Sequence, residues 1–141
     1  MSDAVGKSYP PFEYEVGHEK IREYARAVGE TAEVYFDREA AKAAGFRDVV
    51  APPMFAVVYS AGSVGPAVLD PDVGIDFMRM VHGGQEFAWG EPVCAGDSIT
   101  TEATFKDHSE TNGRKFYVFE SVSKNQHGQE VVRGTWTNIV R

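Results

Sequence analysis

The polar residues best suited to chemistry lie in one short segment, His82-Gly83-Gly84-Gln85-Glu86. Histidine changes its charge near neutral pH and often acts as a general base when a carboxylate orients it. No such acid stands immediately beside His82, so a histidine that holds a strand interface is favoured over a catalytic base. The two-residue alternation leaves Glu86 either buried as an acid or facing water. Gly83 and Gly84 indicate a close approach of the backbone to a helix or to a thin ligand.

The other reactive side chains are scattered along the chain. The thiol of Cys94 lies between Val93 and Ala95 without a cationic neighbour in the sequence to lower its pKa, so it is not expected to be a nucleophile. No cluster of histidines, cysteines or carboxylates has the spacing of metal ligands, and no glycine-rich loop opens a helix to hold a phosphate. We therefore expect no metal centre.

The composition limits the class of protein. With 141 residues, of which 43% are hydrophobic, the chain suits a single domain over residues 1–141 with a sizeable core. A formal net charge of −7 and the lack of any basic run disfavour binding to nucleic acid or to an anionic membrane. One cysteine cannot form an intramolecular disulfide, and the start of the sequence lacks a signal-peptide pattern, so we expect a cytoplasmic protein.

The element expected to organise the fold is the stretch 45–69, which has no charged residue or histidine after Asp48. Pro52-Pro53 predict the start of a helix, because proline displaces the preceding residue from the helical region and is tolerated in a first turn. From Met54 onward the apolar residues recur at helical spacing on nearly every side, which predicts a helix buried in the fold. The stretch has fewer than ~18 unbroken apolar residues, so it is not expected to span a membrane.

Shorter elements surround this helix. The sequence alternates with a period of two in several segments, and Asn112-Gly113 between two of them predicts a hairpin. We expect strands at residues 12–16, 77–89, 98–107, 115–126 and 130–140, and amphipathic helices at 18–28 and 37–44. This order predicts an α+β fold in which a five-stranded antiparallel sheet wraps around the long central helix. Because the edges of such a sheet need covering, we expect a dimer.

This order of elements resembles the hot-dog fold of the MaoC-like dehydratases. The segments that carry the resemblance are 12–29, 35–55 (YFDREAAKAAGFRDVVAPPMF), 82–87 (HGGQEF) and 91–98 (EPVCAGDS). More narrowly, the chain is similar to the N-terminal-type domain, the non-catalytic partner in two-part (3R)-hydroxyacyl-thioester dehydratases. The resemblance covers nearly the whole chain.

The resemblance also implies which positions would carry chemistry. Catalytic members have a Gly-Asp-x-Asn-Pro-x-His segment, whose Asp and His activate the water that adds to or leaves an enoyl thioester. They also have a glycine N–H at the start of the central helix, which polarises the thioester carbonyl. Here Glu30 and Tyr35 stand in place of the Asp and the His, and Pro53, which has no N–H, stands in place of the glycine. The resemblance therefore implies that the chain has no catalytic residue of its own.

The ligand that the resemblance implies is an acyl thioester, with CoA or phosphopantetheine only as part of the substrate and no separate cofactor. The expected substrate-binding residues are Met54, Phe55, Val58, Tyr59, His82, Gly83 and Gly84. The expected partner is a catalytic MaoC-like subunit in a heterodimer, or a second copy in a homodimer.

Three functions fit these observations. The leading one is an accessory, acyl-pocket-forming subunit of a heteromeric (3R)-hydroxyacyl-CoA or acyl-carrier-protein dehydratase. The second is a stand-alone homodimeric hydratase or acyl-CoA thioesterase that uses Glu30, His82 or Glu86 as its base. The third is a non-catalytic module that binds acyl thioesters. Hot-dog folds host several chemistries, so the fold alone does not choose between them.

Overall fold

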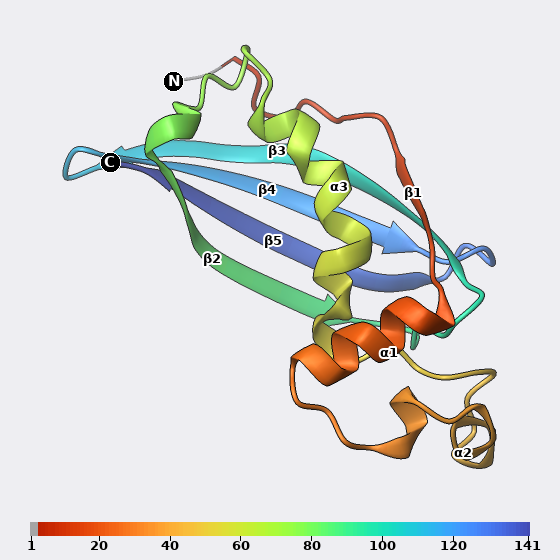
Figure 1. The fold of residues 1–141 in the computed structure, drawn as a ribbon. Helices are drawn as coiled ribbons and strands as arrows, with labels where there is room; N and C mark the ends of the chain where they lie inside the picture. Colours follow the sequence, from red (N-terminus) through yellow and green to blue (C-terminus); the bar gives the residue numbers. More distant parts are fainter. Residues whose placement is uncertain (1–2) are drawn as a thin grey trace.

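Helix α3 (Ala56–Val68) lies across one face of a five-stranded antiparallel sheet in the computed structural model, which describes residues 3–141 (Figure 1). The sheet order is β1-β3-β4-β5-β2. The strands are β1 (Phe12–Glu15), β2 (Met80–Trp89), β3 (Ser98–Thr111), β4 (Arg114–Lys124) and β5 (Glu130–Val140). The predicted α+β architecture, five antiparallel strands around a central helix, is confirmed.

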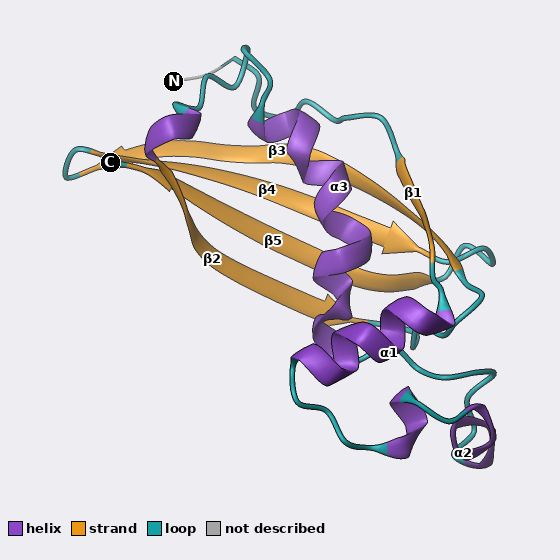
Figure 2. Ribbon diagram, viewed as in Figure 1, coloured by secondary structure: helices purple, strands orange, loops and turns teal. Residues whose placement is uncertain are grey.

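Two shorter helices gather at the end of the sheet where α3 begins (Figure 2). They are α1 (His18–Ala27) and α2 (Arg38–Ala43), each within about a turn of the predicted bounds. Short 3-10 turns at Glu33–Tyr35 and Pro53–Phe55 connect them to the start of α3. This end of the molecule therefore has the segments that could enclose a pocket.

Two strand boundaries differ from the prediction by three residues or more, and the others by two or fewer. Strand β2 begins at Met80, because Phe77–Arg79 form a 3-10 turn. Strand β3 continues to Thr111 instead of ending at residue 107. The reason is the tight turn at Asn112-Gly113, with φ of +54° and +76°, which lets the ladder run up to the pair Thr111–Arg114.

The outward face of α3 is not covered by the described chain, so the prediction of a helix buried on nearly every side is wrong for that face. Tyr59 and Ala67 are buried toward the sheet, whereas Ala61 is exposed. Near the two ends of the helix, Met54 is 47% and Leu69 is 66% exposed. The reason is that a single sheet covers only one side of a helix, so the other side needs a second layer.

Two hydrophobic clusters fill the space between α3 and the sheet. The cluster beneath the C-terminal half of α3 contains Val64 and a stacked pair, Phe105 and Phe119, whose ring centroids are 5.1 Å apart. The cluster beneath the N-terminal half contains Phe55 and Tyr59. The two halves of the helix are therefore anchored in different parts of the core.

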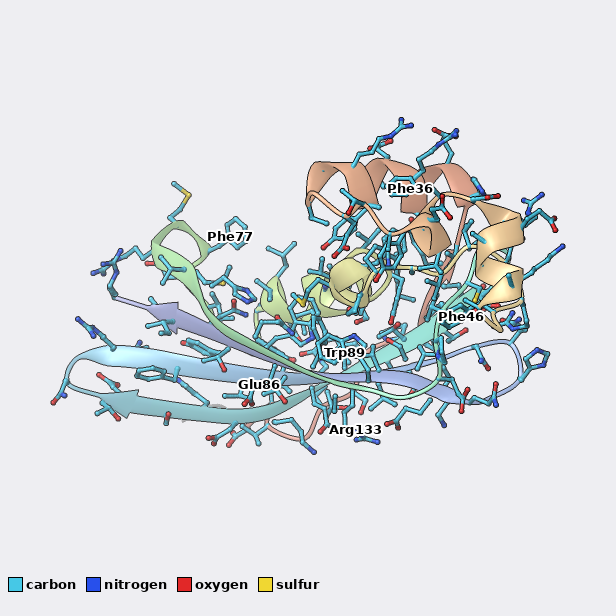
Figure 3. All side chains as sticks on the ribbon, turned by 90° about the horizontal axis from the view of Figure 1, so that it is seen from below. Phe36, Phe46, Phe77, Glu86, Trp89 and Arg133 are labelled. Atoms are coloured by element: carbon cyan, nitrogen blue, oxygen red, sulfur yellow. The ribbon has the colours of Figure 1, made fainter. Side chains whose placement is uncertain are left out.

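The other face of the sheet is lined by charged side chains. Arg133 contacts Glu120 at 3.3 Å and Glu130 at 2.8 Å (Figure 3). Glu86 is exposed on the same face, where it lies opposite Thr135 of β5. The next residue in β2, Phe87, points to the other face and packs against the core. An apolar ligand would therefore bind on the helix side of the sheet.

Candidate functional site

A pocket of about 460 Å³ lies beside the first turns of α3, and we call it the Tyr59 pocket. Its walls come from the turn at Glu33–Tyr35, the loop 46–53, α3 itself, and the end of β2 with the residues that follow it. Much of the lining is aliphatic, with Val34, Val50, Val93 and Val131 among its members. Both the size and the apolar lining are typical of pockets that hold a small ligand.

Hydrogen bonds between distant segments hold the rim of this pocket. The N–H of Val50 donates to the carbonyl of Val34 at 3.0 Å, and the N–H of Ala51 donates to the carbonyl of Val93 at 2.8 Å. The indole Nε1 of Trp89, on the helix side of the sheet in Figure 3, donates to the carbonyl of Pro53 at 2.9 Å. The pocket is thus shaped by tertiary contacts and not by one local motif.

A buried ion pair fixes the base of the same loop. Asp97 is fully buried, and its two carboxylate oxygens accept hydrogen bonds from the guanidinium of Arg47 at 2.5 and 2.9 Å. The backbone N–H of Cys94 and the side-chain amide of Gln126 also donate to this carboxylate. Burial alone would raise the pKa of Asp97, but these donors outweigh it, so the pKa lies below its usual value.

Arg47 also corrects the sequence interpretation of Cys94. The fold brings this cation close to the thiol, although no cation is adjacent in the sequence. Burial nevertheless raises the pKa of Cys94, and the charge of Arg47 opposes this shift without outweighing it. The buried thiol therefore stays protonated at neutral pH, as expected for a residue that is not a nucleophile.

Of the three positions that the resemblance assigns to catalysis, two lie at the Tyr59 pocket. Tyr35 and Pro53 line it, whereas the half-buried Glu30 does not. Burial raises the pKa of Tyr35, and the nearby charge of Glu30 adds to this shift, so the phenol keeps its proton at neutral pH. No histidine is among the described residues that line the pocket, and the one carboxylate there is that of the exposed Glu91.

Of the residues expected to bind substrate, Tyr59 lines this pocket. Phe55 is fully buried in an aromatic cluster, with its ring 5.4 Å from the ring of Tyr24. Met54 lies exposed at the start of the helix, and the half-buried Val58 packs against the cluster that contains Phe55. The expected set is therefore divided between the pocket, the core and the helix surface.

His82 lies in a different place, a groove of about 360 Å³ that we call the His82 groove. The groove runs between the C-terminal half of α3 and strands β2 and β5, and Asn138 and Trp136 belong to its lining. The imidazole of His82 meets the indole of Trp136 edge-on, with ring centroids 6.1 Å apart. Residues His82 and Tyr59, which the sequence interpretation placed in one acyl site, are thus in separate cavities.

Of the two glycines beside His82, Gly83 has a local reason that the sequence interpretation missed. A Cβ at Gly83 would lie 2.4 Å from the side chain of Ile139, a close approach to the neighbouring strand β5, whereas one at Gly84 would make an ordinary contact with Thr137 at 3.8 Å. The ladder also shifts register between His82 and Gly84. Glu86, which faces water, lines none of these cavities.

Several pocket residues were not singled out from the sequence. The main ones are Phe46, Trp89 and Glu91. A usable signal existed in Trp89-Gly90-Glu91-Pro92, where a large aromatic residue precedes a turn. Phe46 gave no such signal, because it lies in a loop whose position depends on the ion pair at Arg47.

No group of three or more His, Cys, Asp or Glu side chains in the part of the chain that the structure describes is arranged to hold a metal ion. No helix within residues 3–141 is long and apolar enough to cross a membrane.

Comparison with known proteins gives consistent likenesses. A family model described as "FAS1-like, dehydratase domain region" matches residues 3–133. A UPF0336 protein of Streptomyces avermitilis is 45% identical over 138 residues, which cover 97% of this chain and 92% of that protein. A UPF0336 protein of Streptomyces coelicolor is 42% identical over 137 residues, which cover 96% and 91%.

Two solved structures are similar over nearly the whole chain. A MaoC-like dehydratase has a TM-score of 0.89 and 27% identity, and the match covers 98% of this chain but 42% of that one. The C-terminally truncated HadBC complex, a (3R)-hydroxyacyl-ACP dehydratase of Mycobacterium tuberculosis, has a TM-score of 0.83 and 27% identity, with 98% of both chains covered.

The similarity to these two solved structures shows the class of protein. The fold is the hot-dog fold of the MaoC-like dehydratases, as the sequence predicted. Within that class, this chain belongs to the FAS1-like dehydratase-region family.

Proposed function

We propose that this chain is the accessory, acyl-pocket-forming subunit of a heteromeric (3R)-hydroxyacyl-CoA or acyl-carrier-protein dehydratase, an enzyme that in reverse hydrates enoyl thioesters. The observation that carries the proposal is the composition of the Tyr59 pocket. Tyr35 and Pro53, which by the resemblance stand where catalytic members have an imidazole and a backbone donor, both line it.

Each of these two residues stands in place of a group that the hydration reaction needs. Hydration needs a base that takes a proton from water, and Tyr35 is a poor base at neutral pH, because burial raises the pKa of its phenol above the usual ~10 and the group keeps its proton. It also needs a donor to the thioester oxygen, and such a donor is usually worth ~2.7–4 kcal/mol. Pro53 has no N–H to supply it. The chemistry is therefore assigned to a partner subunit.

The surface supports a second hot-dog subunit. Strand β2 is the last strand of the sheet, so its outer edge is unpaired within the described chain, and the outward face of α3 lies beside it. Six of the large exposed apolar residues lie on this side: Met54, Leu69, Phe77, Met78, Val81 and Trp89. A subunit that continues the sheet from β2 would cover both features.

Two of the similar structures are complexes. HadBC is described as a complex, and so is ChsH1-ChsH2, whose 20% identity shows the fold alone. In the proposed assembly the substrate is a cytoplasmic acyl thioester, and CoA or phosphopantetheine belongs to the substrate and not to a resident cofactor.

The experiment is a comparison of the chain alone with a co-purified complex. The partner is a MaoC-like subunit with an intact Gly-Asp-x-Asn-Pro-x-His segment, and the assay follows hydration of crotonyl-CoA and of longer enoyl thioesters. We expect hydration by the complex and none by the chain alone. Glu30→Gln in the complex is expected to change kcat/KM by less than about twofold, because Glu30 does not line the pocket. Full activity of the chain alone would contradict the proposal.

One observation favours a second candidate function, a stand-alone hydratase or thioesterase. His82 shares its groove with Asn138, which is 4% exposed, and in this second candidate the imidazole beside that amide is the general base. This function requires acyl-CoA hydrolysis or hydration by the isolated chain that is lost in His82→Ala. Glu86→Gln, on the opposite face of the sheet, is the matched control that should retain it.

A further inference from the structure

The hydroxyl of Tyr59 is a polar group that neither the fold nor the proposed function explains. The residue is 2% exposed, and its ring lies 6.2 Å from that of Phe55 in the core. No group within residues 3–141 forms a hydrogen bond with this hydroxyl. In that same part of the chain, the fully occluded side-chain polar atoms without a partner belong to Gln85 alone, so the Tyr59 hydroxyl is not fully occluded, and the cavity beside this residue is the Tyr59 pocket.

Such a hydroxyl has no stabilising role within the chain. It has left bulk water without gaining a partner among the described residues, whereas a phenylalanine would fill the same space without a polar group to satisfy. Burial also raises the pKa of Tyr59, so the group stays protonated and remains a hydrogen-bond donor. A donor held in this way needs an acceptor that the chain itself does not provide.

The pocket restricts the chemistry of that acceptor. No lysine, arginine or histidine is among the described residues that line it, and the charged residue present is the exposed Glu91. A carboxylate or phosphate would therefore be buried without a counter-charge, which is unfavourable. The aliphatic lining instead suits a hydrocarbon chain.

The position of the hydroxyl restricts where the acceptor lies along the ligand. Tyr59 follows Pro53 by six residues, the first of them in a 3-10 turn that rises ~2.0 Å per residue and the rest in α3 at ~1.5 Å, so the two Cα atoms are roughly 10 Å apart along the helix axis. Pro53 and Trp89 hold the rim, so the acceptor lies inside the pocket and not at its mouth.

We propose that the Tyr59 pocket is itself a binding site for an aliphatic chain that carries an uncharged oxygen, a ketone or a hydroxyl, part-way along its length. Tyr59 selects such a chain by donating a hydrogen bond to that oxygen. A plain hydrocarbon leaves the phenol unpaired and binds more weakly. The inference deepens the proposed function and rests on it only for the idea that the chain is the acyl part of a thioester.

In the test, 2-decanone is titrated into the chain of residues 1–141. Calorimetry measures the binding, and so does tryptophan fluorescence, to which Trp89 in the pocket wall contributes. We expect Tyr59→Phe to weaken binding by about tenfold, the value of one hydrogen bond in a desolvated site. Tyr24→Phe is the matched control: its ring also packs on Phe55, at 5.4 Å, but it lies outside the pocket, and its affinity should equal that of the wild type.

A second measurement separates a binding role from a structural one. Without ligand, Tyr59→Phe should unfold at the same temperature as the wild type or above it, because it loses only an unpaired hydroxyl. A lower unfolding temperature with unchanged affinity for 2-decanone would show that the hydroxyl serves the fold and overturn the inference, as would a wild-type chain that does not bind the ketone.

The failure of this inference differs from the failure of the proposed function. A complex that hydrates enoyl thioesters while its accessory chain ignores 2-decanone would overturn the inference alone. Tyr59-dependent binding of the ketone by a chain that activates no partner would uphold the inference and overturn the proposed function.

Discussion

At the level of single residues, the pair Arg47–Asp97 is the interaction on which the loop around the Tyr59 pocket depends most directly. We expect Asp97→Asn to lower the free energy of unfolding by about 2–3 kcal/mol, because it removes charge-assisted hydrogen bonds to a buried group. The loss should stay below that of a fully buried pair, because the Arg47 side chain is 53% exposed and remains hydrated. Urea unfolding at neutral pH measures the change.

The control is the same substitution at an exposed site. Asp107 is exposed on β3, so Asp107→Asn is expected to change the free energy of unfolding by less than about 0.5 kcal/mol. Equal effects of the two variants would contradict the role given to Asp97.

Two carboxylates with lowered pKa values also predict how stability depends on pH. The hydrogen bonds from Lys7 and then Tyr9 lower the pKa of Asp70 to about 2, and the Arg47 pair lowers that of Asp97. An unfolded Asp titrates near ~3.9, so the stabilisation is complete above about pH 4 and is lost as the pH falls through the folded-state values. The wild type should therefore lose stability between about pH 4 and pH 2.

Unfolding by urea at a series of pH values tests this prediction. Asp97→Asn should lose less stability over the same interval, because one of the groups with a lowered pKa no longer titrates. An identical slope for the wild type and the variant would show that Asp97 does not contribute.

Part of this residue-level description was accessible from the sequence. The replacements at Tyr35 and Pro53 were identified because they fall within local segments with a fixed order. The partners Arg47 and Asp97, 50 residues apart, and Trp89 and Pro53, 36 residues apart, were not. Neither pair has a local pattern, because each forms only when the loop and the sheet have folded together.

At the level of elements, the end of β2 depends on a glycine. A Cβ at Gly90 would lie 2.3 Å from the carbonyl oxygen of Glu130, and a backbone atom cannot move aside as a side chain can. We expect Gly90→Ala to lower the free energy of unfolding by about 1–3 kcal/mol and to disturb the Tyr59 pocket, which Gly90 lines. Thermal or urea unfolding measures the effect.

Gly65→Ala provides the comparison. Nothing lies within 4 Å of a Cβ at this position in α3, and the gain in helix propensity is opposed by crowding against Pro66, so little net change is expected. If both glycine variants were equally stable, the close approach at Gly90 would not matter.

The kinds and order of the helices and strands could be predicted, because the periodicity of apolar residues and the turn residues are local signals. Asn112-Gly113 gave the hairpin in this way, and the extent of β3 followed only from the ladder that the turn permits. The exposed side of α3 could not be predicted, because an apolar helix looks the same whether its own chain or another covers it. The division between the Tyr59 pocket and the His82 groove also required the tertiary fold.

At the level of the whole molecule, the outward face of α3 and the edge of β2 predict a dimer. Ala61→Arg places a long charged side chain on the exposed face of the helix, so we expect it to shift the protein toward monomers without unfolding it. Sedimentation velocity measures the change in assembly, and circular dichroism checks the fold.

Ala43→Arg on the exposed surface of α2 is the matched control, and it should leave the assembly unchanged. Dissociation by both variants, or by neither, would place the contact elsewhere.

The hydrogen bond between Ala51 and Val93 brings the two ends of one continuous stretch of chain together. Everything that would meet a companion subunit through α3 or β2 belongs to that stretch, residues 52–92. Replacing residues 52–92 with the same segment of a relative would exchange α3 and β2 together. The two ends of the exchanged segment would already lie next to each other in space. We therefore expect the choice of companion to travel with this one contiguous stretch, while strands β1, β3, β4 and β5 keep their own sequence.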